Sequence, residues 1–127
     1  TGYHFNGTTP ISYNDFWEYD PVTDIWTEKS QYPGLGKVDC AGFSIGPNYA
    51  YIGMGTPNNT DFWKYDLSTD SWSQILFFEG PGRYGLTSFS FNNKGFVGMG
   101  YSVDASGTTN YTDFWELQDA TLSVNSN

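Results

Sequence analysis

The sequence predicts an all-β fold in which four-stranded antiparallel sheets stack on one another, with about two and a half such sheets in the chain. A motif of Trp, Tyr, a turn and a second Trp occurs twice, as NDFWEYDPVTDIW from Asn14 and as TDFWKYDLSTDSW from Thr60. Aromatic residues make up 20% of the 127 residues and glycine occurs 15 times, a mixture that favours short strands and turns over long helices. The sequence has no amphipathic helical period of useful length.

The repeat extends over nearly the whole chain. Asp-Phe-Trp begins at Asp15, Asp61 and Asp113, and AGFSIGPNYAYIGMG from Ala41 matches TSFSFNNKGFVGMG from Thr87. In two copies a second Trp follows nine residues after the first, whereas the third copy has Val there. The repeated tryptophans are Trp17, Trp26, Trp63, Trp72 and Trp115. A period of about 45 to 50 residues is typical of a solenoid or a propeller.

Each unit divides into four short strands. Two tight hairpin turns, at 47–48 and 92–93, join the first strand to the second. Alternation along the third strand, 61–66, directs Phe62 and Lys64 to one face and Trp63 and Tyr65 to the other. The predicted units are 1–29 (third and fourth strands only), 37–76 (a full sheet) and 83–127 (a sheet with a degenerate fourth strand).

A sheet with two apolar faces cannot bury both alone, so we expect each sheet to pack against its neighbours through the repeated Trp side chains. Glycines near the end of each second strand fit places where a side chain would collide with neighbouring backbone. They are Gly53, Gly55, Gly98 and Gly100.

With these features the sequence resembles the kelch family of β-propellers. The family pattern has a basic residue that opens the first strand, a glycine pair that closes the second, and a Tyr and a Trp in the third and fourth strands. The matching residues are Arg83 (Lys37 in the earlier unit), the four glycines above, Tyr19 or Tyr65, and Trp26 or Trp72. Met54 and Met99 interrupt the glycine pair. The resemblance to kelch arrays of secreted Bacteroidetes-type proteins implies an extracellular or cell-surface location.

Two and a half blades do not close a propeller, which needs roughly four to eight. The first 17 residues align without gaps on residues 99–115, so the chain opens in the middle of a unit. We therefore expect the remaining blades to come from a longer parent chain or from other copies in a symmetric ring.

Charge and composition exclude several classes of partner. Lys and Arg total 5 against 14 Asp and Glu, which gives a formal net charge of −9. This field repels phosphate backbones and anionic lipid, so we expect no nucleic-acid partner, and no apolar run is long enough for membrane insertion. The single cysteine, Cys40, allows neither an internal disulfide nor a Cys-pair metal site. We expect no cofactor and no bound metal.

Variable connections mark one end of the sheets as the candidate functional face. The connection between second and third strands has five residues at 56–60 but twelve at 101–112, and another twelve-residue loop runs over 3–14. We call this end, with the connections between successive units, the loop face. Function is commonly built on such variable loops. The candidate ligand-binding residues are Tyr3, His4, Phe77, Phe78, Tyr101, Asp104 and Tyr111.

Each candidate also has a structural interpretation. Phe77 and Phe78 either anchor a partner or fold over a sheet edge, and Tyr111 matches Tyr13, which favours a role in the fold. Arg83 fits a structural link at the junction between units. His4, the only histidine, fits a solvated loop residue.

The sequence has no catalytic constellation. One His and one Cys do not supply a copper-radical site, and the paired acids at Asp20, Asp24, Asp66 and Asp70 recur in turns, where capping explains them. The sequence therefore predicts a non-catalytic binding or structural module with a protein or glycan partner. The alternatives are a fragment of a kelch-type carbohydrate-active enzyme whose catalytic residues lie in missing blades, and a self-assembling subunit that completes a ring with other copies.

Overall fold

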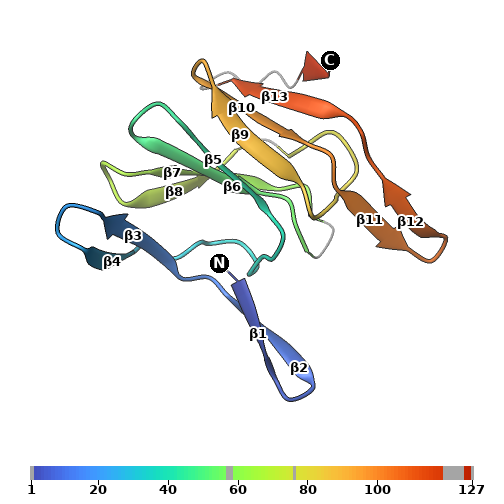
Figure 1. The fold of residues 1–127 in the computed structure, drawn as a ribbon, viewed down its shortest axis with the longest axis horizontal. Helices are drawn as coiled ribbons and strands as arrows, with labels where there is room; N and C mark the ends of the chain where they lie inside the picture. Colours follow the sequence, from blue (N-terminus) through green and yellow to red (C-terminus); the bar gives the residue numbers. More distant parts are fainter. Residues whose placement is uncertain (1, 57–58, 76, 119–124, 127) are drawn as a thin grey trace.

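The computed structural model describes residues 2–56, 59–75, 77–118 and 125–126. Every regular element in these residues is a β-strand, which confirms the all-β prediction (Figure 1). The described part of the chain contains no helix of the length and apolar character that a membrane span requires. The strands are β1 (Gly2–Asn6), β2 (Thr9–Tyr13), β3 (Phe16–Asp20), β4 (Ile25–Lys29), β5 (Ala41–Ile45), β6 (Tyr49–Gly53), β7 (Phe62–Asp66), β8 (Ser71–Gln74), β9 (Thr87–Phe91), β10 (Lys94–Gly98), β11 (Tyr101–Asp104), β12 (Gly107–Asn110), β13 (Phe114–Gln118) and β14 (Asn125–Ser126).

Three antiparallel sheets form the body of the molecule. The central sheet has the order β5-β6-β7-β8, and the C-terminal sheet has the matching order β9-β10-β13-β14. The N-terminal sheet contains β3 and β4 alone. Neighbouring strands are antiparallel and are joined by turns or loops, except that the connection from β10 to β13 contains the strands β11 and β12. The Val that replaces the last Trp, at 124, lies outside the described residues.

Two segments that we expected to be loops are β-hairpins. β1 pairs with β2, and β11 pairs with β12, each as a separate two-stranded sheet. Asp104 and Ser106 explain the second turn, because the Asp104 carboxylate accepts hydrogen bonds from the Ser106 backbone N–H (2.7 Å) and hydroxyl. Short polar side chains that bond nearby backbone are typical of such turns.

The core lies between the central and C-terminal sheets. Alternate residues of β5 are buried, as expected for a strand with one covered face. The ring of Phe43 lies against Gly95 of the facing sheet, where a Cβ atom would stand 2.0 Å from Phe43 Cε2. A glycine is therefore required at that position for the two sheets to approach. Phe62 of β7, two strands away in the same sheet, packs on Phe43 with ring centroids 6.2 Å apart.

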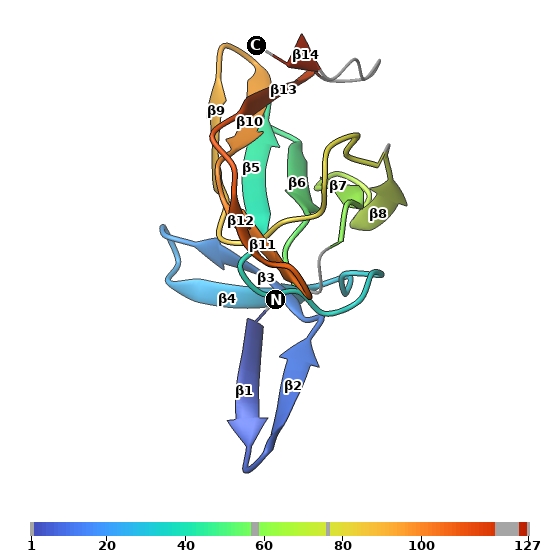
Figure 2. The ribbon, with the colours of Figure 1, turned by 90° about the vertical axis from the view of Figure 1, so that its right-hand side faces the viewer.

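The first strands of these two sheets, β5 and β9, are edge strands and lie side by side (Figures 1 and 2). Their connection uses side-chain hydroxyls. Ser88 Oγ accepts a hydrogen bond from the Gly42 N–H at 3.1 Å and donates one to the Gly42 carbonyl at 3.0 Å. Two residues along, Ser90 Oγ donates to the Ser44 carbonyl. These bonds satisfy some of the backbone polar groups that an uncovered edge strand would expose.

Repeated aromatic residues join the N-terminal and central sheets. Phe16 packs edge-on against Tyr65 and Trp72, at centroid distances of 4.8 and 5.0 Å. The Trp72 indole N–H also donates to the Ser30 carbonyl at 2.8 Å. Trp72 therefore packs between sheets in the way the repeat predicts.

The outer tryptophans differ from that expectation. Trp17 is 45% exposed and Trp26 is 62% exposed. They lie on the N-terminal sheet and Trp17 faces away from the central sheet, whereas the matching Trp63 and Trp72 are partly buried. The difference has a simple physical reason, since no sheet in the described residues covers that face.

Candidate ligand-binding face

Both hairpins project from the loop face. In Figures 1 and 2 they leave the sheets at the end opposite the turns 46–48 and 92–93. The hairpins β1–β2 and β11–β12 occupy matching places in the first and third units, immediately before Asp15 and Asp113. The loop face therefore carries two ordered projections, rather than the two long loops predicted from the sequence.

Hairpin β1–β2 separates its side chains into two sets. Tyr3 pairs with Ser12 and Phe5 with Pro10, whereas His4 pairs with Ile11. Because side chains alternate along a strand, the first two pairs share one face of the hairpin and His4 lies on the other. The first face lines a groove between the hairpin and the body of the molecule.

This groove has a volume of about 270 Å³. The hairpin supplies one wall, and the other comes from the connection between the N-terminal and central sheets together with Thr56, which follows β6. The lining residues are Tyr3, Phe5, Pro10, Ser12, Gly36, Val38 and Thr56. All are uncharged, and Val38 and Thr56 are held together by an antiparallel bridge.

Close contacts hold the hairpin in place against this wall. A Cβ atom on Gly36 would stand 2.5 Å from Ser12 Cβ, so only glycine allows this approach. The Asn14 amide donates to the Gly34 carbonyl at 2.8 Å, and the Tyr32 N–H donates to the Asn14 carbonyl at 2.9 Å. The groove is therefore preformed, with its two walls joined at the base of the hairpin.

Two aromatic rings dominate the groove. Tyr3 is 51% exposed and Phe5 is 61% exposed, and their rings meet edge to face at 5.4 Å. Exposed aromatic rings beside hydroxyl groups can stack on an apolar ligand surface while the hydroxyls fix its orientation. Tyr3 is the one predicted candidate that the structure places in this groove.

His4 lies on the opposite face of the hairpin. Its Nδ1 accepts or donates a hydrogen bond with the Tyr13 hydroxyl at 2.5 Å, and the two rings stack at 5.5 Å. The same cross-strand pair recurs in hairpin β11–β12, where Ser102 and Tyr111 hydroxyls lie 2.9 Å apart. Because the same contact recurs, we interpret His4 as a residue that stabilises its own hairpin.

Tyr111 and Arg83 form part of a structural cluster. The Arg83 guanidinium lies 3.8 Å from the Tyr111 ring centroid and forms a two-pronged ion pair with Asp113, through Nη1 and through Nη2 at 3.1 Å. The hydrogen bond from Arg83 lowers the pKa of Asp113, and Trp115 adds a second donor to the same carboxylate at 2.6 Å. Arg83 is fully buried and joins Asp113 to the Met99 carbonyl. A ligand on the surface therefore cannot reach its guanidinium.

The central sheet repeats this arrangement with Lys37. Its ammonium lies 2.5 Å from Asp61, and both side chains are buried. The Trp63 indole (2.9 Å) and the Tyr32 hydroxyl (3.2 Å) also donate to Asp61. Burial, followed by the nearby Asp61 charge, raises the pKa of Tyr32 and keeps its hydroxyl protonated as a donor.

Tyr101 and Asp104 belong to hairpin β11–β12, away from the groove. Tyr101 bridges to Tyr84, and their rings meet edge to face at 4.6 Å. Hydrogen bonds from the side chain and backbone of Ser106 lower the pKa of Asp104, which lies exposed in the hairpin turn. Both residues are explained by the hairpin itself.

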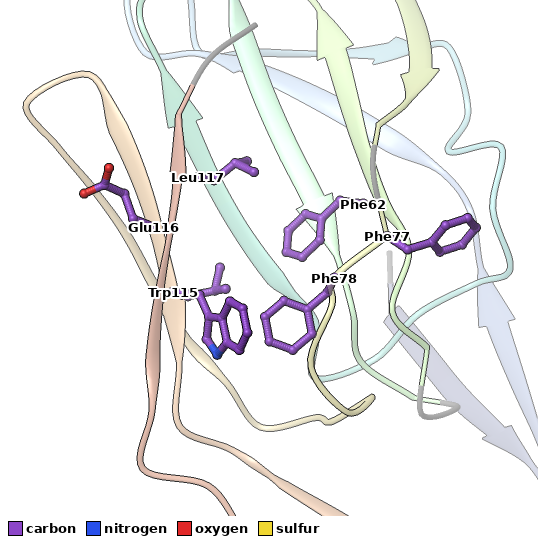
Figure 3. Close-up of a pocket in the computed structure, with 7 residues that line it drawn as sticks. Phe62, Phe77, Phe78, Trp115, Glu116 and Leu117 are labelled. Carbon is purple, nitrogen blue, oxygen red and sulfur yellow. The ribbon is translucent and has the colours of Figure 1, made fainter. Parts of the chain in front are cut away.

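The adjacent rings Phe77 and Phe78 have different surroundings. Phe78 is only 6% exposed and packs on Trp115 at 4.7 Å, which agrees with the alternative that it folds over a sheet edge. Phe77 is 60% exposed, and Figure 3 shows it pointing away from the other labelled rings. The small pocket around them, between the central and C-terminal sheets, has a volume of about 20 Å³. That is room for about one water molecule.

The acidic turn residues accept hydrogen bonds within their own turns and, at Asp70, from the segment that follows β4. Asp20 accepts from Val22 N–H and Thr23, and its pKa is lowered chiefly by the backbone donor. Asp70 accepts from the Tyr65 hydroxyl at 2.5 Å and from the Ser30 N–H. Within the described ranges, His, Cys, Asp and Glu do not gather in any group of three or more that could hold a metal ion.

Sequence reasoning missed most of the groove. Phe5, Ser12, Gly36, Val38 and Thr56 were not among the candidates, because 3–14 was expected to be a loop. A signal was present in the Asn6-Gly7 pair, since Asn-Gly between strand-forming residues is a strong hairpin signal. The position of the opposite wall depends on contacts that no local pattern reveals.

Comparisons with known proteins give a fold relationship only. No protein-family model matches the chain, and no curated protein matches it significantly. Among solved structures, that of YjhT superposes with a TM-score of 0.62 and 24% sequence identity over 72% of this chain. The matched region is 27% of YjhT, so the chain spans about a quarter of that protein's length. The chain is therefore similar in fold to a portion of YjhT.

Proposed function

We propose that this chain is part of a kelch-type β-propeller and acts as a non-catalytic binding module whose loop face takes an uncharged glycan. The successive sheets are the blades in this proposal, and the groove lined by Tyr3 and Phe5 is the ligand site. An extracellular or cell-surface location belongs to the same proposal, through the resemblance of the repeat to secreted arrays.

The blade arrangement is supported by the matching strand order of the two four-stranded sheets and by the aromatic contacts between neighbours. The buried ion pairs of Lys37 with Asp61 and of Arg83 with Asp113 stand at equivalent places in successive units. Equivalent contacts at equivalent positions are what a repeat architecture requires.

The ligand proposal depends on one observation. Tyr3 and Phe5 are exposed on the side of hairpin β1–β2 that faces the groove, although the hairpin itself is fixed against the body of the molecule. Rings buried for stability would be covered by the protein, whereas these remain open to solvent above a groove. The C–H faces of a pyranose ring stack on such aromatic rings, and Ser12 and Thr56 offer hydroxyls to its edges. The uncharged lining and the net charge of −9 favour neutral sugars over acidic ones.

The non-catalytic part of the proposal is supported by the groove's chemistry. Its lining residues include no Asp, Glu, His, Lys or Cys, so they offer no acid–base pair. General acid–base catalysis requires a proton donor and an acceptor within hydrogen-bond reach of the substrate.

A glycan array followed by calorimetry tests this function. The chain is screened against neutral and acidic oligosaccharides, and the best ligand is titrated into the wild type, Tyr3→Ala and Phe5→Ala. We expect neutral glycans to bind and each substitution to weaken binding by about tenfold, as for loss of an aromatic anchor.

Leu67→Ala is the matched control, because Leu67 is an exposed apolar residue in the turn at the opposite end of the central sheet. Its binding should equal that of the wild type. Binding that survives both groove substitutions would refute the groove as the site. Preference for acidic glycans would refute the ligand class.

A further inference from the structure

Hairpin β1–β2 turns at the only Asn-Gly pair of the sequence, Asn6-Gly7. The last pair of its ladder joins Asn6 to Thr9, so the two turn residues, Gly7 and Thr8, lie beyond the paired strands. Gly7 has a φ of 74° and is the first turn residue, which is where a two-residue turn of type II′ favours glycine. The tip of the hairpin projects away from the sheets (Figures 1 and 2). The Asn-Gly pair is therefore held at a defined point of the surface.

The space around this turn is open. Residues 3–13 are all exposed, and a Cβ atom on Gly7 would meet nothing beyond its chain neighbours within 4 Å. β1 and β2 form a sheet of their own, and an isolated two-stranded hairpin is only marginally stable in water. Local opening at the tip should therefore cost little free energy. Water can reach the Asn6 side chain, and the turn can change conformation around it.

An Asn side chain in this setting can react with the backbone that follows it. When the Gly7 backbone nitrogen attacks Asn6 Cγ, an N–Cγ bond forms and the Cγ–Nδ2 bond breaks. The leaving nitrogen takes up the proton of the Gly7 amide and departs as ammonia, which leaves a cyclic imide. Water then opens the ring at Cγ to give an aspartyl residue, or at the Asn6 backbone carbonyl carbon to give an isoaspartyl residue. Glycine hinders the attack least because it has no Cβ.

Other asparagines of the molecule are less suited to this reaction. The Asn14 amide is held by a hydrogen bond of 2.8 Å to a backbone carbonyl. Asn48 and Asn93 also lie in hairpin turns, but Tyr49 and Lys94 follow them, and these larger residues hinder attack by the backbone nitrogen. The two turns therefore supply internal controls for Asn6.

We propose that Asn6 is a site of spontaneous deamidation and that its isoaspartyl product disables the groove beside it. An isoaspartyl residue routes the main chain through Cβ and Cγ, which lengthens it next to the turn. Turn type and length fix the register of a hairpin. Phe5 adjoins Asn6, pairs with Pro10 and contributes its ring to the groove, so a change of register displaces that ring. The consequence for ligand binding rests on the glycan function proposed above.

Timed incubation of the 127-residue chain in mildly alkaline buffer tests the modification. Peptide mapping by mass spectrometry follows each asparagine, and an isoaspartate assay identifies the product at position 6. We expect Asn6 to gain the mass difference between water and ammonia well before Asn48 and Asn93. Its rate should lie within about tenfold of that in a free peptide of residues 4–9, a limit that corresponds to about 1.4 kcal/mol of opening free energy.

Nuclear magnetic resonance measures the effect on the hairpin without any ligand. The cross-strand contacts of Phe5 with Pro10 should be lost in the isoaspartyl form, whereas those of Phe43 with Tyr51 in the central sheet should remain. Asn6→Asp carries the new charge on a normal main chain and should keep both sets of contacts.

Asn6→Gln is the matched control, because its longer side chain retains the amide but must close a larger ring. This variant should keep its mass and its strand contacts over the same incubation. When a neutral glycan is titrated into incubated samples, binding should fall in proportion to the isoaspartyl content of the wild type and stay constant in Asn6→Gln.

Two results would overturn the proposal. Modification of Asn6 no faster than that of Asn48 and Asn93, or slower than the peptide by more than the stated factor, would remove the site. Unchanged contacts between Phe5 and Pro10 in the isoaspartyl form would remove its effect on the groove. If the fresh chain binds no glycan while both changes occur, the glycan function fails and the modification site stands.

Discussion

Replacement of Lys37 by Met removes the cation from a buried carboxylate and should destabilise the fold severely. Lys37 is fully buried, and its ammonium lies 2.5 Å from Asp61, which is 6% exposed. Met retains most of the apolar stem, so packing changes little. The Asp61 carboxylate would keep only the Trp63 and Tyr32 donors, at 2.9 and 3.2 Å.

The expected cost is about 3–5 kcal/mol of unfolding free energy, because removal of one partner leaves an uncompensated buried charge. Total stabilities of about 5–15 kcal/mol are usual, so the variant should be marginal. Urea denaturation followed by tryptophan fluorescence measures this loss. Adding Asp61→Asn to the variant should recover part of it, since the charge is then removed as well.

An exposed ion pair supplies the control. Lys29 lies 3.3 Å from Glu18 with side chains 20% and 50% exposed. Lys29→Met should therefore cost less than about 1 kcal/mol. Equal losses for the two Lys→Met variants would refute the conclusion that the Lys37–Asp61 pair is a buried structural link.

Two further results are expected. Gly95→Ala places a methyl group 2.0 Å from the Phe43 ring and should cost about 1–3 kcal/mol in urea denaturation; an unchanged midpoint would contradict the close approach of the two sheets. The pKa of Asp113 is lowered chiefly by its hydrogen bond from Arg83, so its stabilisation is present above the unfolded-state value of 3.8 and is lost as pH falls through the folded-state pKa. Asp113→Asn should therefore flatten the fall in unfolding free energy between about pH 5 and pH 2, and parallel curves would contradict this cause.

Local pattern was sufficient to predict the strands of the sheets. Alternation at Phe62 and Tyr65 assigned each to the correct face, because the side-chain period of a strand is fixed by its backbone. The glycine positions followed from the same repeat, and Gly55 has the positive φ (91°) that favours glycine.

The candidate site was less accessible from sequence because it depends on non-local contacts. Phe77 and Phe78 are chemically alike, and the bond from Phe78 N–H to the Thr60 carbonyl at 2.7 Å fixes which ring is covered. Phe5 becomes a groove residue only because Gly36 lets the hairpin approach. The contact between the hairpin and Gly36 could not be predicted from the sequence pattern of residues 1–13, because that pattern describes only the hairpin itself.

The ion pair in each full sheet joins the segment before its first strand to the residue at the end of the connection between its second and third strands. In the central sheet this connection is short, whereas in the C-terminal sheet it holds an entire hairpin, yet Lys37 with Asp61 and Arg83 with Asp113 make the same contact. Segments of different length can therefore be exchanged at this place without cost to the framework beneath. Selection, or a protein engineer, can vary what the molecule recognises separately from what keeps it folded.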